Sequence, residues 1–263
     1  MTLNLPAEMP LVMATEIAKS YQQVAALAPL SFTIQPGERV ALAGPSGSGK
    51  TTLLNLLSGM LPPDAGMLCI AEQDLSRLAP GRELSRLVGL IHQQYDLVPQ
   101  LPVIHNVLAG RLGEWSLFNS VVSLIWPRDR HLAQSALAQL GIADKIQERT
   151  SHLSGGEQQR VAIARMMVQS PRLVLADEPV ASLDPGRAEE MLRLLTELTT
   201  SSGKTLVSSL HSPYLILKYF SRVIGLRGGR LQFDLPTTQV TEAVLDNLYD
   251  LKSAAAEVGS EAG

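Results

Sequence analysis

Eight residues, GPSGSGKT at 44–51, have the composition and spacing of a phosphate-binding loop. Three glycines in this loop leave no side chains between the backbone N–H groups and an incoming phosphate. Lys50 adds a positive charge toward the outer phosphate oxygens, and Thr51 offers a hydroxyl to Mg²⁺. We therefore predict that ATP and Mg²⁺ bind here. The residues predicted to contact the nucleotide are Gly44, Pro45, Ser46, Gly47, Ser48, Gly49, Lys50, Thr51 and Thr52.

The segments on either side of the loop favour a strand–loop–helix unit. GERVALAG at 37–44 is a short, apolar, β-prone run, and TTLLNLLSG at 51–59 has helical spacing. A helix that begins here directs the positive end of its dipole at the anion. The alternative, a glycine-rich turn with a chance lysine, does not account for this context.

Two adjacent carboxylates, Asp177 and Glu178, end the apolar run of VLADEP at 174–179. Ligands of open α/β sheets bind outside the carboxyl ends of the strands, so both carboxylates are expected beside the phosphate loop. We predict that Asp177 binds Mg²⁺, directly or through water, and that Glu178 polarises the water that attacks the γ-phosphoryl group. The alternative is that both residues cap a helix beginning near Pro179, which explains the acidity but not the apolar run.

A third motif, LSGGEQ at 153–158, precedes the helical stretch EQQRVAIARMMV. The Ser154 hydroxyl, together with Gly155 and Gly156, which permit close backbone approach, would form a second anion site at a helix start. Ser154 followed by Glu157 is also the pattern of a capping box. Both interpretations can hold, because a cap and an anion site use the same N–H groups. One chain cannot fold this motif back onto its own loop-bound nucleotide.

The elements that must position these motifs follow from the apolar runs. Short runs at 86–93, 172–178, 204–211 and 221–226 are separated by helical stretches, which predicts a mainly parallel sheet that includes the strand before the phosphate loop. The segment up to about Val40 alternates apolar and polar residues, which predicts antiparallel strands in a side sheet.

An inserted helical lobe is predicted where the strand signal disappears, between about Gln94 and Thr150. HLAQSALAQLGI at 131–142 has helical spacing and a stop at Gly141. The predicted fold class is α/β, with a P-loop NTPase core, an N-terminal antiparallel β subdomain and an inserted α-helical subdomain. The predicted organisation is one ATP-binding domain at 11–235, with core segments 11–93 and 160–235, a lobe at about 94–159, a C-terminal helix at 236–252 and a disordered tail at 253–263.

Composition restricts the class of protein further. The 263 residues are 45% hydrophobic, which is enough for a sizeable core, and no stretch approaches the about 20 apolar residues of a membrane span. The N-terminus lacks a secretion-signal pattern, and Cys69 stands alone, so we expect a cytoplasmic location and no internal disulfide. A net charge of −3 gives no electrostatic reason to expect a nucleic-acid partner.

Taken together, these motifs resemble those of the ATP-binding subunits of ABC transporters, over about residues 11–235. The resemblance implies that Ser154, Gly155 and Gly156 bind the γ-phosphate of ATP held by a second subunit, so that a homodimer is the active form. It implies further roles for four residues: Gln93 in the loop that reaches Mg²⁺ and the attacking water, His211 as the switch histidine, Asp184 in the loop that crosses the dimer interface, and Tyr21 stacked on adenine.

The resemblance also implies partners. We expect polytopic membrane permease subunits, a periplasmic substrate-binding protein, and a peripheral position on the cytoplasmic face of the inner membrane. The apolar run LFNSVVSLIW at 117–126 is a candidate surface for contact with the permease. The alternative, with at least equal weight, is that most of these side chains pack inside the lobe.

The substrate prediction depends on overall resemblance. VLAGRLGEWSLFNSVVSLIWPRDR and ADEPVASLDP look most like the ATPases of bacterial phosphonate importers, whereas SPY after His211 and DLPTTQV at 234–240 depart from that pattern. A soluble ABC ATPase that remodels a macromolecular or phosphonate-degrading complex is the alternative, as is the ATPase of an exporter. A single nucleotide-binding core without long coiled-coil heptads argues against the remodelling class, and the phosphonate-degrading variant stays open.

Overall fold

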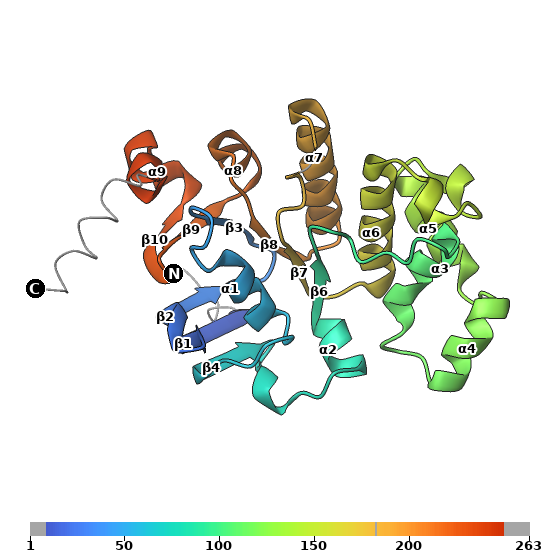
Figure 1. Cartoon of the computed structure of the whole chain (residues 1–263), viewed down its shortest axis with the longest axis horizontal. Coiled ribbons are helices and arrows are strands. Elements are labelled where there is room, and N and C mark those ends of the chain that lie inside the picture. Colours follow the sequence, from blue (N-terminus) through green and yellow to red (C-terminus); the bar gives the residue numbers. More distant parts are fainter. Residues whose placement is uncertain (1–8, 182, 250–263) are drawn as a thin grey trace, which may run out of the picture.

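Two β-sheets flank the phosphate loop in the computed structural model, which describes residues 9–181 and 183–249 (Figure 1). The larger sheet has six strands in the order β10-β9-β3-β8-β7-β6. Its neighbouring strands are parallel except for the hairpin of β9 and β10, as the apolar runs predict. The strands are β3 (Arg39–Ala43), β6 (Val88–Ile91), β7 (Leu173–Ala176), β8 (Thr205–Ser209), β9 (Arg222–Arg227) and β10 (Arg230–Pro236).

The smaller sheet is antiparallel, with the order β2-β1-β4-β5. Its long hairpin of β1 (Val12–Tyr21) and β2 (Val24–Ile34) corresponds to the predicted side sheet. The strands β4 (Ala65–Ile70) and β5 (Gln73–Asp74) complete it and were not predicted. After β2, a turn with Gly37 at φ 76° passes the chain directly into β3 of the larger sheet. The phosphate loop begins at the other end of β3, after Ala43.

Helices cover the larger sheet and form the inserted lobe (Figure 1). Those next to the sheets are α1 (Lys50–Leu57), α2 (Arg82–Leu87), α6 (Gly155–Gln169), α7 (Pro185–Ser201), α8 (Pro213–Tyr219) and α9 (Glu242–Tyr249), with short 3₁₀ turns η1 (Leu75–Arg77) and η5 (Thr237–Gln239). The lobe contains α3 (Val103–Leu108), η2 (Ala109–Arg111), α4 (Leu117–Ile125), α5 (Arg130–Gln139), η3 (Ala143–Lys145) and η4 (Thr150–His152). Residues 253–263, predicted as a disordered tail, lie outside the described residues.

Strand β7 shows how the sheet fixes the position of the acidic pair that follows it. All four residues of β7 are fully buried. Leu173 and Leu175 pack into the cluster that contains α1 and the small sheet, whereas Val174 and Ala176 face the cluster that contains α6, α7 and α8. Because side chains alternate along a strand, a one-residue slip would exchange the two faces. The next residue, Asp177, is therefore held at a defined point on the edge of the sheet.

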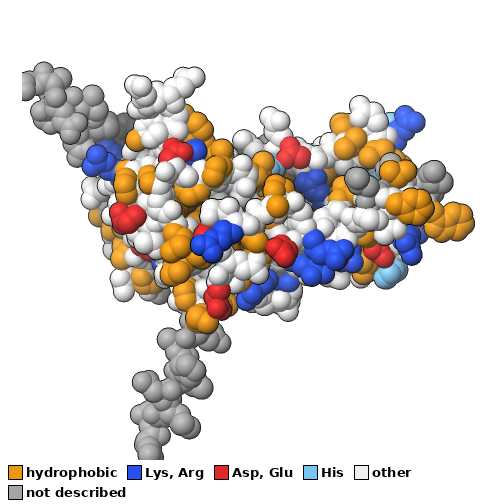
Figure 2. All heavy atoms as spheres, turned by 90° about the horizontal axis from the view of Figure 1, so that it is seen from below, with side chains coloured by type: hydrophobic (Ala, Val, Ile, Leu, Met, Phe, Trp, Pro, Cys, Tyr) orange, Lys and Arg blue, Asp and Glu red, His pale blue; other side chains and the backbone are white. Residues whose placement is uncertain are grey.

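The lobe is packed mainly by α3, α5 and α6, and α4 projects from it. Three large apolar side chains of this region are strongly exposed, with Phe118 and Trp126 at 76% and Val121 at 61%. Figure 2 shows apolar side chains protruding at the lobe end of the molecule. Within the described part of the chain, no helix is long and apolar enough to cross a membrane.

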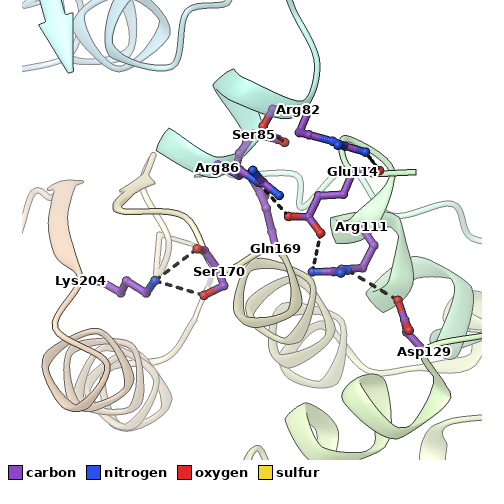
Figure 3. Close-up of polar contacts among 9 residues, drawn as sticks. All are labelled: Arg82, Ser85, Arg86, Arg111, Glu114, Asp129, Gln169, Ser170 and Lys204. Carbon is purple, nitrogen blue, oxygen red and sulfur yellow. Dashed lines mark hydrogen bonds and ion pairs between the residues drawn. The ribbon is translucent and has the colours of Figure 1, made fainter. Parts of the chain in front are cut away.

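The connection between η2 and α4 is attached to the core by a polar network (Figure 3). The Arg82 guanidinium on α2 donates to the Glu114 carbonyl at 2.7 Å, and Arg86 Nε donates to Glu114 Oε1 at 3.1 Å. From the lobe side, Arg111 Nη1 lies 2.7 Å from Glu114 Oε2, and Arg111 Nε lies 3.6 Å from Asp129 Oδ2. Glu114 therefore joins the lobe to α2, the helix that leads into β6.

Candidate functional site

The phosphate loop connects β3 to α1, so the predicted strand–loop–helix unit is present. Two of its glycines are required by packing as well as by backbone conformation. Gly44 has φ 147°, and a Cβ there would lie 2.1 Å from the Leu226 carbonyl oxygen. Gly49 has φ 101°, and a Cβ there would lie 2.6 Å from Leu27 Cδ2. Side chains at these positions would displace the loop from β9 and β2.

The Lys50 ammonium is turned back onto the loop. Its Nζ donates to the carbonyl oxygens of Gly44 at 2.8 Å and Pro45 at 3.0 Å. Burial lowers the pKa of Lys50, and the nearby Glu178 and Asp177 carboxylates oppose that effect. The ammonium is thus a cation held by neutral carbonyls, and phosphate oxygens would be stronger partners for it.

The loop forms a pocket whose residues suit a phosphate chain. It is lined by Ala26, Ser46, Gly47, Ser48, Gly49, Lys50, Thr51, Thr52 and Glu178. The Ser48 hydroxyl is buried and has no hydrogen-bond partner among the described residues. A Cβ at Gly47 would meet no heavy atom within 4 Å, so this glycine borders open space. The pocket thus offers a lysine, four hydroxyl side chains at 46, 48, 51 and 52, and glycine backbone amides. This set of groups fits a nucleoside triphosphate with its Mg²⁺.

The acidic pair lies at the carboxyl edge of the sheet, beside this pocket. The Asp177 amide donates to the Ile91 carbonyl at 2.9 Å, which joins the ends of β7 and β6. Glu178 follows with φ 46°, and its Oε1 lies 2.6 Å from Nε2 of His211. The structure therefore brings the predicted base and the predicted switch histidine into direct contact.

Ser209, at the end of β8, connects these groups and was missed in the sequence. Its Oγ accepts from the Glu178 amide at 2.8 Å and donates to Asp177 Oδ1 at 2.7 Å. The first hydrogen bond fixes the backbone at Glu178, and the second orients the Asp177 carboxylate. The available signal was a hydroxyl residue at the carboxyl end of one of the strands predicted for the parallel sheet.

Gln93 and Tyr21 lie on different elements, and neither lines the phosphate-loop pocket. Gln93 is exposed, two residues beyond the end of β6. The Ile91 carbonyl accepts from the Asp177 amide, so the chain that leaves β6 toward Gln93 starts at the edge of the sheet that carries the acidic pair. Tyr21 lies at the tip of the β1–β2 hairpin with 46% of its surface exposed, and Ala26 of the same hairpin lines the phosphate-loop pocket.

The LSGGEQ motif is folded as a capping box at the start of α6. Ser154 Oγ accepts from the Glu157 amide at 3.4 Å, and Glu157 Oε2 accepts from the Ser154 amide at 2.8 Å. The Ser154 hydroxyl and backbone also lower the pKa of Glu157 below its ordinary value. A Cβ at either Gly155 or Gly156 would meet nothing within 4 Å. Contacts within this chain therefore do not explain why these two residues are glycine.

This motif lines a hollow of its own, with Gly141, Ile142, Arg160, Leu183, Arg187, Glu190 and Met191. None of these residues lines the phosphate-loop pocket. The buried Gln159 of α6 donates through Nε2 to the Pro179 carbonyl, which ties the motif's helix to the acidic edge. Asp184 caps α7, since its Oδ1 accepts from the Arg187 amide at 3.1 Å. Ser182, in the same loop, lies outside the described residues.

The strand–loop–helix unit, the carboxylates at the sheet edge and the antiparallel side sheet define a P-loop nucleotide-binding fold with an inserted helical lobe. The sequence profile of the ABC transporter family matches residues 27–181. This chain belongs to the ABC transporter family, and it has the fold and motifs of the family's ATP-hydrolysing cassette.

Relatives with curated names match over most of the chain. A phosphonates import ATP-binding protein from Pseudomonas aeruginosa is 47% identical over 240 residues, covering 90% of each protein. One from Anaeromyxobacter dehalogenans is 44% identical and covers 96% of this chain and 51% of the relative. Among solved structures, a dimeric ATP-binding cassette bound to ADP and Pi in a post-hydrolysis state is 29% identical, with a TM-score of 0.72, covering 86% of this chain and 98% of that one.

Proposed function

We propose that this chain is the ATP-hydrolysing subunit that energises an ABC transporter importing phosphonate or a related oxyanion. The observation that carries the proposal is the 47% identity with a phosphonates import ATP-binding protein over 90% of both chains. The match spans the lobe as well as the catalytic core, and the lobe is the part predicted to contact a permease. Glu178 and His211, in contact at 2.6 Å, would supply the hydrolytic chemistry that import requires.

ATP with Mg²⁺ would bind the phosphate-loop pocket. Lys50 would exchange its two carbonyl partners for phosphate oxygens, and Thr51, Gln93 and Asp177 would surround the metal. The carboxylate of Glu178 would orient water in line with the γ-phosphoryl group, with His211 holding that carboxylate in place. Tyr21, at the exposed hairpin tip, would stack on the adenine.

The active form would be a homodimer with two composite sites. Support comes from the open space around Gly155 and Gly156, and from the separate hollows formed by LSGGEQ and the phosphate loop. A second copy could bring its LSGGEQ helix start onto this chain's nucleotide, where the amides, the Ser154 hydroxyl and the helix dipole would bind the γ-phosphate. Asp184, exposed at the start of α7, would lie at the interface.

The proposed membrane partner is a polytopic permease that contacts the lobe, taken as about residues 94–159. The exposed Phe118, Val121 and Trp126 are the apolar side chains available for this contact. If the permease moved the segment between η2 and α4, the contacts of Glu114 would transmit that movement to α2. Helix α2 leads into β6, the strand that precedes Gln93. A periplasmic substrate-binding protein would deliver the substrate, and this chain would remain peripheral on the cytoplasmic face of the inner membrane.

The test is to isolate the tagged chain from native membranes in mild detergent and to identify the proteins that accompany it by mass spectrometry. A polytopic permease should copurify, and Phe118→Ser with Trp126→Ser should reduce its yield. A soluble enzyme complex or ribosomal proteins without a permease would refute the transport role and favour a remodelling ATPase.

Substrate is tested separately, by growth. A strain lacking this chain should lose growth on a phosphonate as sole phosphorus source and keep growth on inorganic phosphate. The wild-type chain should restore growth on the phosphonate, and Lys50→Ala should not. Normal phosphonate uptake in the deletion strain would refute the substrate assignment.

A further inference from the structure

We propose that Tyr249, the last described residue of α9, is a positioning residue of the ATP site that holds the phosphate loop in its binding conformation. This inference rests on the proposed function, because it concerns the same phosphate loop. The segment that carries Tyr249 lies beyond residue 235, outside the domain predicted from the motifs. Its contact with the loop is therefore an addition to the machinery of the site.

The contact joins residues 205 positions apart in the chain. The Gly44 amide donates to the Tyr249 hydroxyl at 3.2 Å. On its other side, the Gly44 carbonyl accepts from Lys50 Nζ at 2.8 Å. The first residue of the phosphate loop is thus held between the tyrosine hydroxyl and the lysine that is predicted to bind the outer phosphates.

Gly44 is closely packed against β9, and the Tyr249 hydroxyl is the partner of its amide. The residue is buried, its φ is 147°, and a Cβ built there would lie 2.1 Å from the Leu226 carbonyl oxygen. A buried amide without a partner is unfavourable. If the hydroxyl were removed, the loop would have to move to expose the amide to water, or another group would have to approach it.

Helix α9 is firmly docked where it supplies this hydroxyl. Leu245 is 5% exposed and Leu248 is 3% exposed, both within the core cluster that contains Ala176 of β7 and Val223 of β9. Arg227 Nη1 at the end of β9 donates to the Asn247 carbonyl at 2.9 Å. Burial of Tyr249 raises the pKa of its phenol, so the hydroxyl stays protonated and neutral through the physiological range. The hydroxyl is therefore a fixed acceptor at a fixed distance from the loop.

Because binding requires the loop to be in its competent conformation, the apparent affinity for nucleotide falls with the fraction of molecules in that conformation. Tyr249 raises this fraction before nucleotide arrives. The coupling is reciprocal, so nucleotide bound to the loop should also stabilise the docked state of α9.

The first test compares nucleotide affinity in the full-length chain. Fluorescent ADP should bind Tyr249→Phe about threefold to tenfold more weakly than wild type, the size expected for one neutral hydrogen bond. Tyr219→Phe is the matched control, because Tyr219 is also half-buried and its hydroxyl bonds to Glu189, away from the loop. Its affinity should equal that of the wild type. Equal affinity of Tyr249→Phe and wild type would overturn the inference.

The second test separates positioning from general stability. In wild type, ADP should slow amide hydrogen exchange in residues 242–249, and in Tyr249→Phe this slowing should be lost while the melting temperature stays within a few degrees of wild type. A wild-type helix whose exchange does not respond to ADP would contradict the coupling. If the wild-type chain binds no nucleotide at all, the proposed function fails first, and that outcome is distinct from either result for Tyr249.

Discussion

Replacing Gly156 with alanine separates what the single chain needs from what a composite site needs. Gly156 is the second residue of α6, and a Cβ there would meet no heavy atom within 4 Å. Its φ lies outside the left-handed range that excludes side chains. Alanine should therefore be accommodated in the folded chain without any rearrangement.

The expected change in stability is small and favourable. Alanine is preferred over glycine inside a helix by about 1 kcal/mol, and by less in the first turn. For a chain of this size, that corresponds to a rise in melting temperature of up to about 3 °C. Activity should move in the opposite direction. A methyl group between the helix amides and a partner-bound γ-phosphate would remove at least one anion contact, which typically lowers turnover by about 10²-fold to 10³-fold.

The assay is steady-state ATP hydrolysis together with thermal unfolding of Gly156→Ala and wild type. Gly186→Ala is the stability control, because Gly186 is also the second residue of its helix and a Cβ there would make only an ordinary contact, 3.6 Å from Asp184 Oδ1. Both variants should show the same small gain in melting temperature. If Gly156→Ala hydrolysed ATP at the wild-type rate, the LSGGEQ motif would not approach a nucleotide, and the reasoning would be refuted.

Three further predictions follow from the contacts of the site and the lobe. Ser154→Ala should cost about 1 kcal/mol of unfolding free energy at pH 7. The Ser154 hydroxyl donates to Glu157 Oε2 and lowers the pKa of that carboxyl below its ordinary value, so this part of the cost should be lost as pH falls through the lowered pKa, and urea unfolding at several pH values that showed a constant difference would contradict it. Asp177→Asn should raise the Mg²⁺ concentration for half-maximal hydrolysis about tenfold or more, while EDTA abolishes wild-type activity; an unchanged Mg²⁺ dependence would exclude Asp177 from the metal site. Glu114→Ala removes the acceptor shared by Arg86 and Arg111, so hydrolysis by the isolated chain should be unchanged while stimulation in the permease complex falls, and undiminished stimulation would show that the network does not couple the lobe to the core.

The sequence was most informative where local chemistry leaves few choices. The phosphate loop requires glycine at 44 and 49 for reasons visible in the structure, since side chains there would collide with β9 and β2. All residues of β7 are apolar because both faces of this strand are buried. The uninterrupted apolar run predicted that the acidic pair after it lies at the sheet edge. The capping box at Ser154 depends on residues only three positions apart, so the local sequence predicts it as well.

The sequence was least informative about contacts between distant segments. Ser209 bonds to the Asp177 carboxylate and to the Glu178 amide, but a serine near a strand end has many uses, and only the pairing of β7 with β8 shows this one. Tyr249 contacts Gly44 across 205 positions, and no local pattern marks that contact. The strands β4 and β5 escaped prediction because β5 has only two residues and half of β4 is exposed, so neither has a strong apolar pattern.

The most direct measurement is the oligomeric state and turnover of Glu178→Gln with and without ATP and Mg²⁺, by light scattering after size-exclusion chromatography. The amide keeps the shape of the side chain next to His211 and removes the charge that orients water. If two copies share two ATP molecules, this variant should bind ATP, form a stable ATP-dependent dimer and hydrolyse almost none of it. A variant that stayed monomeric with bound ATP, or that turned over ATP at the wild-type rate, would contradict a shared site in which Glu178 activates the water.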